Sequence, residues 1–166
     1  MSEGKPFVFV LIPFKNDFDD IYRLGIKETA DKVGLRAERV DEQIYAESML
    51  ERIYQQIKAA DIIVADMTGQ NANVFYEVGY AHALNKLCIL MTQNSSDIPF
   101  DLKQHRHIVY GNSIVGLQNS LEQNLIWAAS QISTDCWIPL RSDPRGVRIK
   151  TWTGFMPQVQ GSPGIR

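Results

Sequence analysis

Residues 61–66, Asp-Ile-Ile-Val-Ala-Asp, followed by the polar loop Met-Thr-Gly-Gln-Asn-Ala at 67–72, decide the fold class of this chain. Four consecutive apolar residues between two acids are typical of a short strand that is buried on both faces. Beyond the loop, apolar residues recur at near-helical spacing over residues 73–85. A buried strand, a loop and a helix form one β/α unit, and we expect the rest of the chain to repeat it.

The same alternation extends in both directions from this unit. The predicted strands are 7–12, 35–40, 61–66, 87–92 and 107–110, and the predicted helices are 17–33, 47–60, 73–85 and 114–132. Strands that alternate with helices predict a parallel sheet covered by helices on both faces. Because crossovers between parallel strands are right-handed, we expect an α/β, flavodoxin-like (Rossmann-like), doubly wound five-stranded sheet in the order 2-1-3-4-5.

The pattern changes at residue 133. Residues 133–166 contain four Pro, four Gly and two Trp, with a net charge of +3, so residues 1–132 carry −5 of the total of −2. Two short apolar segments, 136–140 and 147–152, flank Ser142-Asp-Pro-Arg-Gly146, which has the residues of a hairpin turn. We therefore predict an α/β domain over residues 1–132 and a C-terminal extension over 133–166, formed by a β-hairpin and a loose end.

Composition restricts the class of partner. The chain has 166 residues, 45% of them hydrophobic and 22% charged, which suits one globular domain. Its apolar runs are far shorter than the roughly 20 residues that span a bilayer, and its N-terminus lacks a signal peptide pattern, so we expect a cytoplasmic protein that does not bind membranes. A net charge of −2 argues against binding to nucleic acid polymers. A small molecule is the expected partner.

No cofactor or metal is indicated by the sequence. Cys88 and Cys136 form no CxxC motif, and no His or Cys cluster with metal-ligand spacing is present. The motifs GxGxxG, GxxxxGK[ST], HExxH and GxSxG are also missing. The sequence therefore gives no motif support for dinucleotide redox chemistry, P-loop hydrolysis, zinc proteolysis or serine hydrolysis.

The candidate site follows from the predicted strand order. In an open parallel sheet, ligands bind beyond the carboxyl ends of the strands where the order reverses, here between the first and third strands. This crevice receives the loop that begins Pro13-Phe14 and the loop 66–73. Asn73 and Glu77 are four residues apart on the predicted helix, so both side chains lie on one face, and the helix terminus is expected to keep the Glu77 carboxylate ionised.

Two carboxylates beside an amide cluster suit cleavage at the anomeric carbon of a sugar. Glu77 would attack this carbon or stabilise an oxocarbenium ion, and Asp66 would hold sugar hydroxyls or assist proton transfer. Each residue also has a structural interpretation. A Glu near a helix N-terminus is favoured by the dipole alone, Asn71 or Asn73 caps a helix, and Asp66 closes a turn between a strand and a helix.

Residues 60–84, together with residues 7–14, 17–20 and 98–102, resemble the nucleoside 2-deoxyribosyltransferase-like superfamily, which includes nucleotide N-glycosidases and, more distantly, TIR domains that cleave NAD. The resemblance implies that Glu77 is the nucleophile and that Asp66 lies near the base or sugar. It also implies that Thr68, Gly69, Gln70 and Asn71 donate hydrogen bonds to a substrate phosphate. Transferases carry an Asp six residues before the Glu, whereas this chain has Asn71 there, which argues against deoxyribosyl transfer itself.

The leading hypothesis is an enzyme that cleaves the N-glycosidic bond of a nucleoside, nucleotide or NAD-like molecule, without a cofactor or metal. Glu77 and Asp66 are its predicted catalytic residues, and Pro13, Phe14, Thr68, Gly69, Gln70, Asn71 and Asn73 are its predicted substrate-binding residues. A second hypothesis is a nucleotide-binding sensor or signalling module that uses the same crevice without turnover. A third is an interaction domain that acts through Trp137 and Trp152. The resemblance also implies a homo-oligomer.

Overall fold

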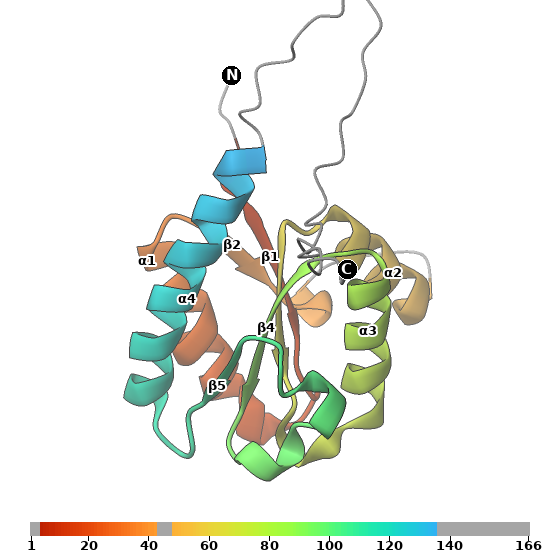
Figure 1. The fold of residues 1–166 in the computed structure, drawn as a ribbon, viewed down its shortest axis with the longest axis vertical. Coiled ribbons are helices and arrows are strands. Elements are labelled where there is room, and N and C mark those ends of the chain that lie inside the picture. Colours follow the sequence, from red (N-terminus) through yellow and green to blue (C-terminus); the bar gives the residue numbers. More distant parts are fainter. Residues whose placement is uncertain (1–3, 43–47, 136–166) are drawn as a thin grey trace, which may run out of the picture. The chain divides into compact units, whose positions relative to one another are not determined.

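The computed structural model describes residues 4–42 and 48–135, with side chains up to residue 132. Its sheet has five parallel strands in the order β2-β1-β3-β4-β5 (Figure 1). The strands are β1 (Phe7–Leu11), β2 (Arg36–Glu38), β3 (Ile62–Asp66), β4 (Leu87–Thr92) and β5 (His107–Val109). The doubly wound, flavodoxin-like sheet predicted from the sequence is confirmed.

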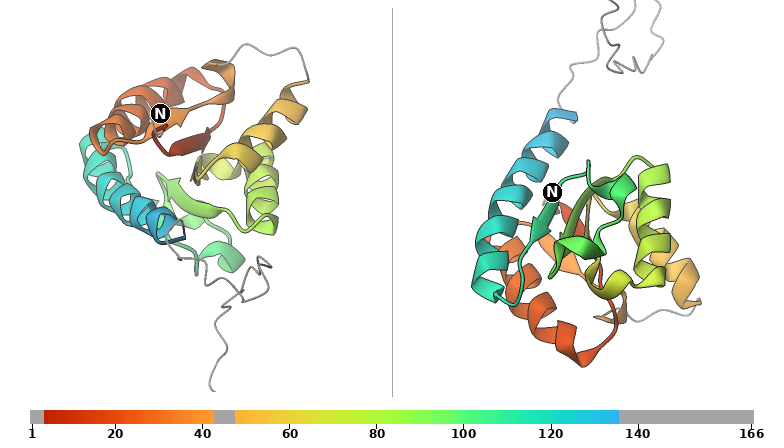
Figure 2. Two further views of the ribbon diagram at one scale, coloured as in Figure 1. Left: turned by 90° about the horizontal axis from the view of Figure 1, so that it is seen from above. Right: turned by 60° about the horizontal axis from the view of Figure 1, so that its bottom comes forward.

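Helices cover both faces of the sheet. They are α1 (Glu28–Lys32), α2 (Met49–Ala59), α3 (Ala72–Ala83) and α4 (Ile114–Asp135), and a π-helical segment, Ile21–Lys27, leads directly into α1. The view from above in Figure 2 shows α1 and α4 on one face and α2 and α3 on the other. Alternate residues of β1 therefore enter different apolar cores, with Val8 and Val10 in the core under α4 and Phe9 in the core under α2 and α3.

Two helices differ from the prediction. The helix expected over residues 17–33 is divided into a 3₁₀ turn, Asn16–Phe18, then the π-helical segment and α1. Within the π-helical segment, a Cβ added to Gly25 would lie 2.7 Å from Cδ2 of Leu117 on α4, so this position has room only for glycine without movement of a buried leucine. The last helix was expected to end at residue 132 but reaches Asp135, since neither Gly nor Pro follows until Pro139. The predicted C-terminal hairpin lies outside the described residues.

The first turn of α2 is held by a capping box. The Ser48 hydroxyl oxygen accepts a hydrogen bond from the Glu51 N–H at 3.3 Å, and the Ser48 N–H donates to the Glu51 carboxylate at 3.2 Å. These bonds satisfy two backbone donors that the helix itself leaves free. They define where α2 begins, and with it the position of the apolar residues Met49 and Leu50.

Replacing Ser48 with Ala is expected to lower the free energy of unfolding by about 1 kcal/mol, because the N–H of Glu51 loses its side-chain acceptor. Urea denaturation measures this difference. Ser96→Ala is a suitable control, because no hydrogen bond of the Ser96 hydroxyl is found among the described residues. Equal stability of the two variants would show that water replaces the cap of α2.

Candidate active site

A pocket of about 480 Å³ lies at the carboxyl ends of β1 and β3. Its walls come from the segment after β1, the first turns of α2 and the first turns of α3. The lining residues are Ile12, Pro13, Phe14, Lys15, Met49, Leu50, Ile53, Asn71, Asn73, Val74, Tyr76 and Glu77. The structure therefore brings five of the predicted site residues together, namely Pro13, Phe14, Asn71, Asn73 and Glu77.

Glu77 is the acidic residue in this lining, and its side chain is largely removed from water. The residue is 9% exposed, and among the described residues none donates a hydrogen bond to its carboxyl group. Burial raises the pKa of Glu77 to about 7. The helix terminus was expected to keep this carboxylate ionised, but its pKa instead lies near neutral pH, where both the neutral and the ionised forms are populated. Glu77 lies in the second turn of α3, beyond the first turn where the dipole acts, and desolvation dominates.

The two predicted amides have different roles. The side-chain oxygen of Asn71 accepts hydrogen bonds from the N–H groups of Asn73 and Val74, so Asn71 caps α3. Asn73 is exposed, and its side chain makes no hydrogen bond to a described residue. One turn before Glu77 on the same helix face, the Asn73 amide is free to contact a ligand in the pocket.

Asp66 lies outside the pocket lining. It is fully buried at the end of β3, where one carboxylate oxygen accepts the Thr68 N–H at 2.9 Å and the other accepts the Tyr110 hydroxyl at 2.7 Å. Burial raises the pKa of Asp66, and the hydrogen bonds from Thr68 and Tyr110 oppose this effect. These contacts match the structural interpretation of Asp66, in which it closes the turn between β3 and α3.

The loop residues Thr68, Gly69 and Gln70 also lie outside the pocket lining. Their polar groups contact the segment after β4: the Thr68 hydroxyl accepts the Gln93 N–H, the Gly69 N–H donates to the Asp97 carboxylate, and the Gln70 amide donates to the Ser96 carbonyl. A positive φ at both Gly69 and Gln70 produces the tight turn on which these groups lie. Three donors or acceptors that the resemblance assigned to a phosphate are thus engaged within the protein.

Aromatic and apolar side chains form most of the pocket wall, and sequence reasoning missed several of them. Phe14 is 54% exposed and Tyr76 is 63% exposed, and the Tyr76 hydroxyl accepts a hydrogen bond from Tyr54 of α2 at 2.9 Å. Met49 and Leu50 of α2 are each about half exposed. The sequence feature that could have indicated these wall residues was the apolar pair Met49-Leu50 at the start of an amphipathic helix. Sequence periodicity, however, does not distinguish a helix face in the core from one in a pocket wall.

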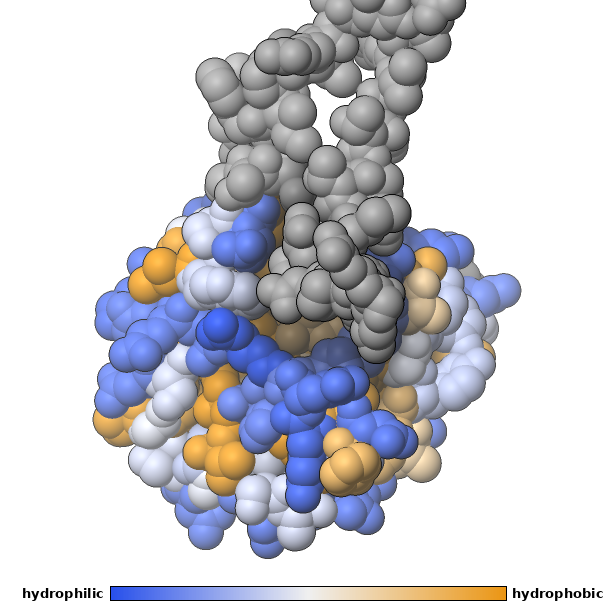
Figure 3. Space-filling view, viewed as in Figure 1, coloured by the Kyte–Doolittle hydropathy of each residue, from blue (hydrophilic) through white to orange (hydrophobic). Residues whose placement is uncertain are grey.

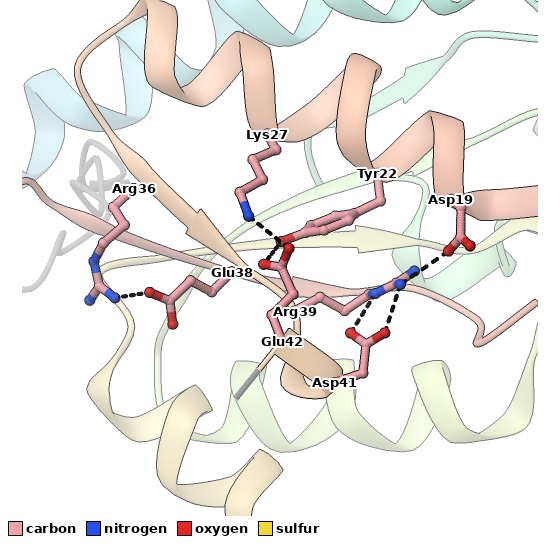
Figure 4. Close-up of polar contacts among 8 residues, drawn as sticks. All are labelled: Asp19, Tyr22, Lys27, Arg36, Glu38, Arg39, Asp41 and Glu42. Carbon is pink, nitrogen blue, oxygen red and sulfur yellow. Dashed lines mark hydrogen bonds and ion pairs between the residues drawn. The ribbon is translucent and has the colours of Figure 1, made fainter. Parts of the chain in front are cut away.

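A network of charged residues around Arg39 lies beside Phe14 of the pocket wall (Figure 4 shows the network). Arg39, directly after β2, is 7% exposed and donates to both carboxylate oxygens of Asp41 and to Asp19. Its guanidinium lies 4.7 Å from the ring centre of Tyr22 and 5.9 Å from that of Phe14. Although burial lowers the pKa of Arg39, the two carboxylates outweigh it and raise the pKa above its ordinary value. The charged Arg39 is therefore in cation–π contact with Phe14, a residue of the pocket lining.

The described residues of the lining offer one carboxyl group, one exposed amide, the Lys15 ammonium group and aromatic faces. Within residues 4–42 and 48–135, no three His, Cys, Asp or Glu side chains come together in a way that would hold a metal ion. In the same part of the chain, no helix combines the length and apolarity needed to cross a membrane. A carboxylate in a partly apolar pocket is suited to attack on, or stabilisation of, an electron-poor carbon.

Solved structures with a similar fold include two enzymes that act on nucleosides or nucleotides. A 2-deoxyribosyltransferase from Bacillus psychrosaccharolyticus aligns with a TM-score of 0.55 and 16% identity over 70% of this chain and 90% of that one. The CMP N-glycosidase of Clostridium botulinum aligns with a TM-score of 0.52 and 16% identity over 70% of this chain and 98% of that one. At these identities, both similarities show a shared fold.

A 2-desoxiribosyltransferase from Leishmania mexicana aligns less well, with a TM-score of 0.47 and 18% identity. The alignment covers 54% of this chain and 65% of that one, so this chain spans just under two thirds of the Leishmania protein. Comparison of the sequence with curated proteins gives no match.

The family assignment comes from the sequence itself. The model of the nucleoside 2-deoxyribosyltransferase family matches residues 8–149, a range that contains every residue of the pocket lining. This match confirms the resemblance carried by residues 60–84 and extends it beyond α4. The chain belongs to the nucleoside 2-deoxyribosyltransferase family.

Proposed function

We propose that this protein cleaves the N-glycosidic bond of a nucleoside or nucleotide and that Glu77 is the nucleophile. Family membership supports glycosyl transfer or N-glycosidase activity. The observation that carries the assignment to Glu77 is its place in the pocket: the residue is 9% exposed and lies one helical turn from the free amide of Asn73. A carboxylate in such a position attacks an anomeric carbon without competition from bulk water.

In the proposed reaction the ionised Glu77 oxygen forms a bond to C1′ of the sugar as the C1′–N bond breaks. The electron pair of the broken bond leaves with the base, which takes a proton from water. The hydroxide left by this proton transfer then attacks C1′ of the glycosyl ester, and the bond from C1′ to the Glu77 oxygen breaks, which releases free sugar and restores the Glu77 carboxylate. A second base in place of water would give base exchange. Asn73 would hold a sugar hydroxyl, and the exposed faces of Phe14 and Tyr76 would contact the base.

The pocket offers limited support for a phosphate. The polar groups of Thr68 and Gly69 bind Gln93 and Asp97, and Asn71 occupies the first free N–H groups of α3. Lys15 is then the cation in the lining that would meet a substrate phosphate or the diphosphate of an NAD-like molecule. We therefore propose that Lys15, rather than the loop 68–71, determines whether the pocket prefers nucleotides over nucleosides.

A sensor without turnover is the second candidate. The observation that favours it is the position of Asp66, which the structure places outside the pocket lining and in contact with Thr68 and Tyr110. With Asn71 as the cap of α3, the described residues of the lining include one carboxyl group and no second acid that would move a proton during hydrolysis. A protein of this kind would bind its nucleoside or nucleotide and release no base.

The test is detection of free base by mass spectrometry after incubation with deoxynucleosides, nucleoside monophosphates and NAD. The enzyme proposal requires base release from at least one compound. Thermal unfolding is followed with the same compounds. Stabilisation by one compound that is returned intact would reject the enzyme and support the sensor, whereas neither release nor stabilisation would reject both.

The pH dependence of the reaction follows from the pKa of about 7 at Glu77. Because a nucleophile must be ionised, kcat/KM is expected to rise about tenfold per pH unit below pH 7 and to level off above it. Initial rates over a pH series, with the folded state checked by circular dichroism at each pH, measure the profile. A rate that instead falls as the pH rises through 7 would identify Glu77 as a proton donor and contradict its role as nucleophile.

A further inference from the structure

A second pocket, of about 440 Å³, lies at the amino ends of β4 and β5, whereas Glu77 lies beyond the carboxyl ends of the strands. It is formed by the end of α3, the first residues of β4, the segment that leads into β5, and the later turns of α4. Its lining residues are His82, Asn85, Lys86, Leu87, Cys88, Gln104, His105, Arg106 and Trp127. None of them belongs to the candidate active site, so this pocket is a separate feature of the fold.

Among the described residues, the lining of this second pocket carries basic side chains and no carboxylate. Lys86 donates to the backbone carbonyls of Lys58 and Ala60 at 2.6 and 2.9 Å, and Arg106 donates to the side-chain oxygen of Asn124 at 3.0 Å. Both cations therefore have neutral partners among the described residues. Figure 3 shows strongly hydrophilic side chains over the segment that leads into β5. Because the chain as a whole carries a net charge of −2, this positive charge is a local feature.

Ring contacts hold three of the basic side chains in place. The Arg106 guanidinium lies 3.9 Å from the ring centre of Trp127, and the rings of His82 and His105 are stacked with centres 4.4 Å apart. Nε2 of His82 is buried without a hydrogen-bond partner in the described part of the chain. These groups are fixed before any ligand arrives, which reduces the entropy lost on binding.

We propose that the second pocket binds a small molecule through a phosphate group, with Arg106 and Lys86 as the main contacts. Two cations without carboxylate partners, placed on one concave surface, attract an anion and retain donors for its oxygens. A guanidinium held against an indole ring presents its remaining N–H groups in a fixed plane, as bidentate recognition of phosphate requires. The same surface would repel a metal cation.

Binding of a phosphate should be coupled to the protonation of His82. Burial and the neighbouring His105 lower the pKa of His82. The charged groups that line the pocket beside His82 and His105 are Arg106 and Lys86, and a carboxylate that lines an adjacent groove, Asp61, accepts the Phe7 N–H. A bound phosphate would favour the protonated His82 imidazole and so oppose the effects that lower its pKa.

The test is a titration of the full chain with inorganic phosphate and, separately, with AMP, followed by NMR of the histidine ring protons. The chain has three histidines, His82, His105 and His107, so each signal is assigned with one His→Gln variant. Saturable shifts of the His82 and His105 signals are expected below about 10 mM ligand, against sodium chloride at equal ionic strength. A response to AMP alone would identify a nucleotide as the ligand, and a response to both would identify the phosphate group.

Arg106→Gln should weaken phosphate binding about tenfold, because it removes the charge. Lys103→Gln is the matched control, since it removes an exposed cation three residues away and outside the lining, and it should leave the affinity unchanged. The proposal is overturned if the wild-type signals do not move, if chloride produces the same shifts, or if both variants lose the same affinity. The wild-type titration decides the matter even if Arg106→Gln does not fold.

Discussion

Replacing Glu77 with Gln is expected to reduce base release by about 10⁴-fold, because the amide keeps the shape of the side chain but cannot act as a nucleophile. The loss should appear in kcat while the dissociation constant of the substrate changes little. The measurement is release of free base under single-turnover conditions. Glu28→Gln is the matched control, since Glu28 is an exposed acid outside the candidate active site, and it should retain full activity.

The same variant should change stability in a pH-dependent way. Burial raises the folded-state pKa of Glu77 from 4.5 to about 7. The stability that the protonated carboxyl contributes is therefore complete below pH 4.5 and is lost as the pH rises through 7. Relative to Glu77→Gln, the wild-type protein should lose unfolding free energy across this window, as measured by urea denaturation at several pH values. A constant difference would show that Glu77 is solvated, and full activity of Glu77→Gln would reject its catalytic role.

Replacing Asp66 with Ala is expected to lower the free energy of unfolding by about 2–4 kcal/mol, because it leaves two buried donors without an acceptor. These donors are the Thr68 N–H and the Tyr110 hydroxyl. Asp66→Asn should cost less than about 1 kcal/mol, since its amide oxygen accepts from Thr68 and its amide nitrogen donates to the Tyr110 oxygen. Urea denaturation of both variants measures these differences, with the exposed Asp101→Ala as the control.

Activity of the Asp66 variants separates structure from chemistry. If Asp66 only supports the turn before α3, Asp66→Asn should release base at close to the wild-type rate. A well-folded Asp66→Asn protein that no longer releases base would instead assign Asp66 the role near the sugar or base that the family resemblance implied. A fully stable Asp66→Ala protein would contradict the hydrogen-bond account of the turn.

Local patterns in the sequence determined the fold and part of the site. The apolar runs that became β3 and β4 must be covered on both faces, and right-handed crossovers between such strands allow few arrangements. The spacing of Asn73 and Glu77 places them one turn apart on α3, whatever surrounds the helix. These features depend on neighbours within a few residues, which is why they are visible in the sequence.

Only the tertiary structure decided how those residues are used. Asp66 was assigned to the site from its place at a strand end, but Tyr110, which lies 44 residues later and follows β5, binds its carboxylate in the interior. Met49 and Leu50 became pocket wall because α2 packs beside α3. The pKa of Glu77 depends on how much water those walls remove. Burial and long-range partners arise when distant segments meet, and no local periodicity encodes them.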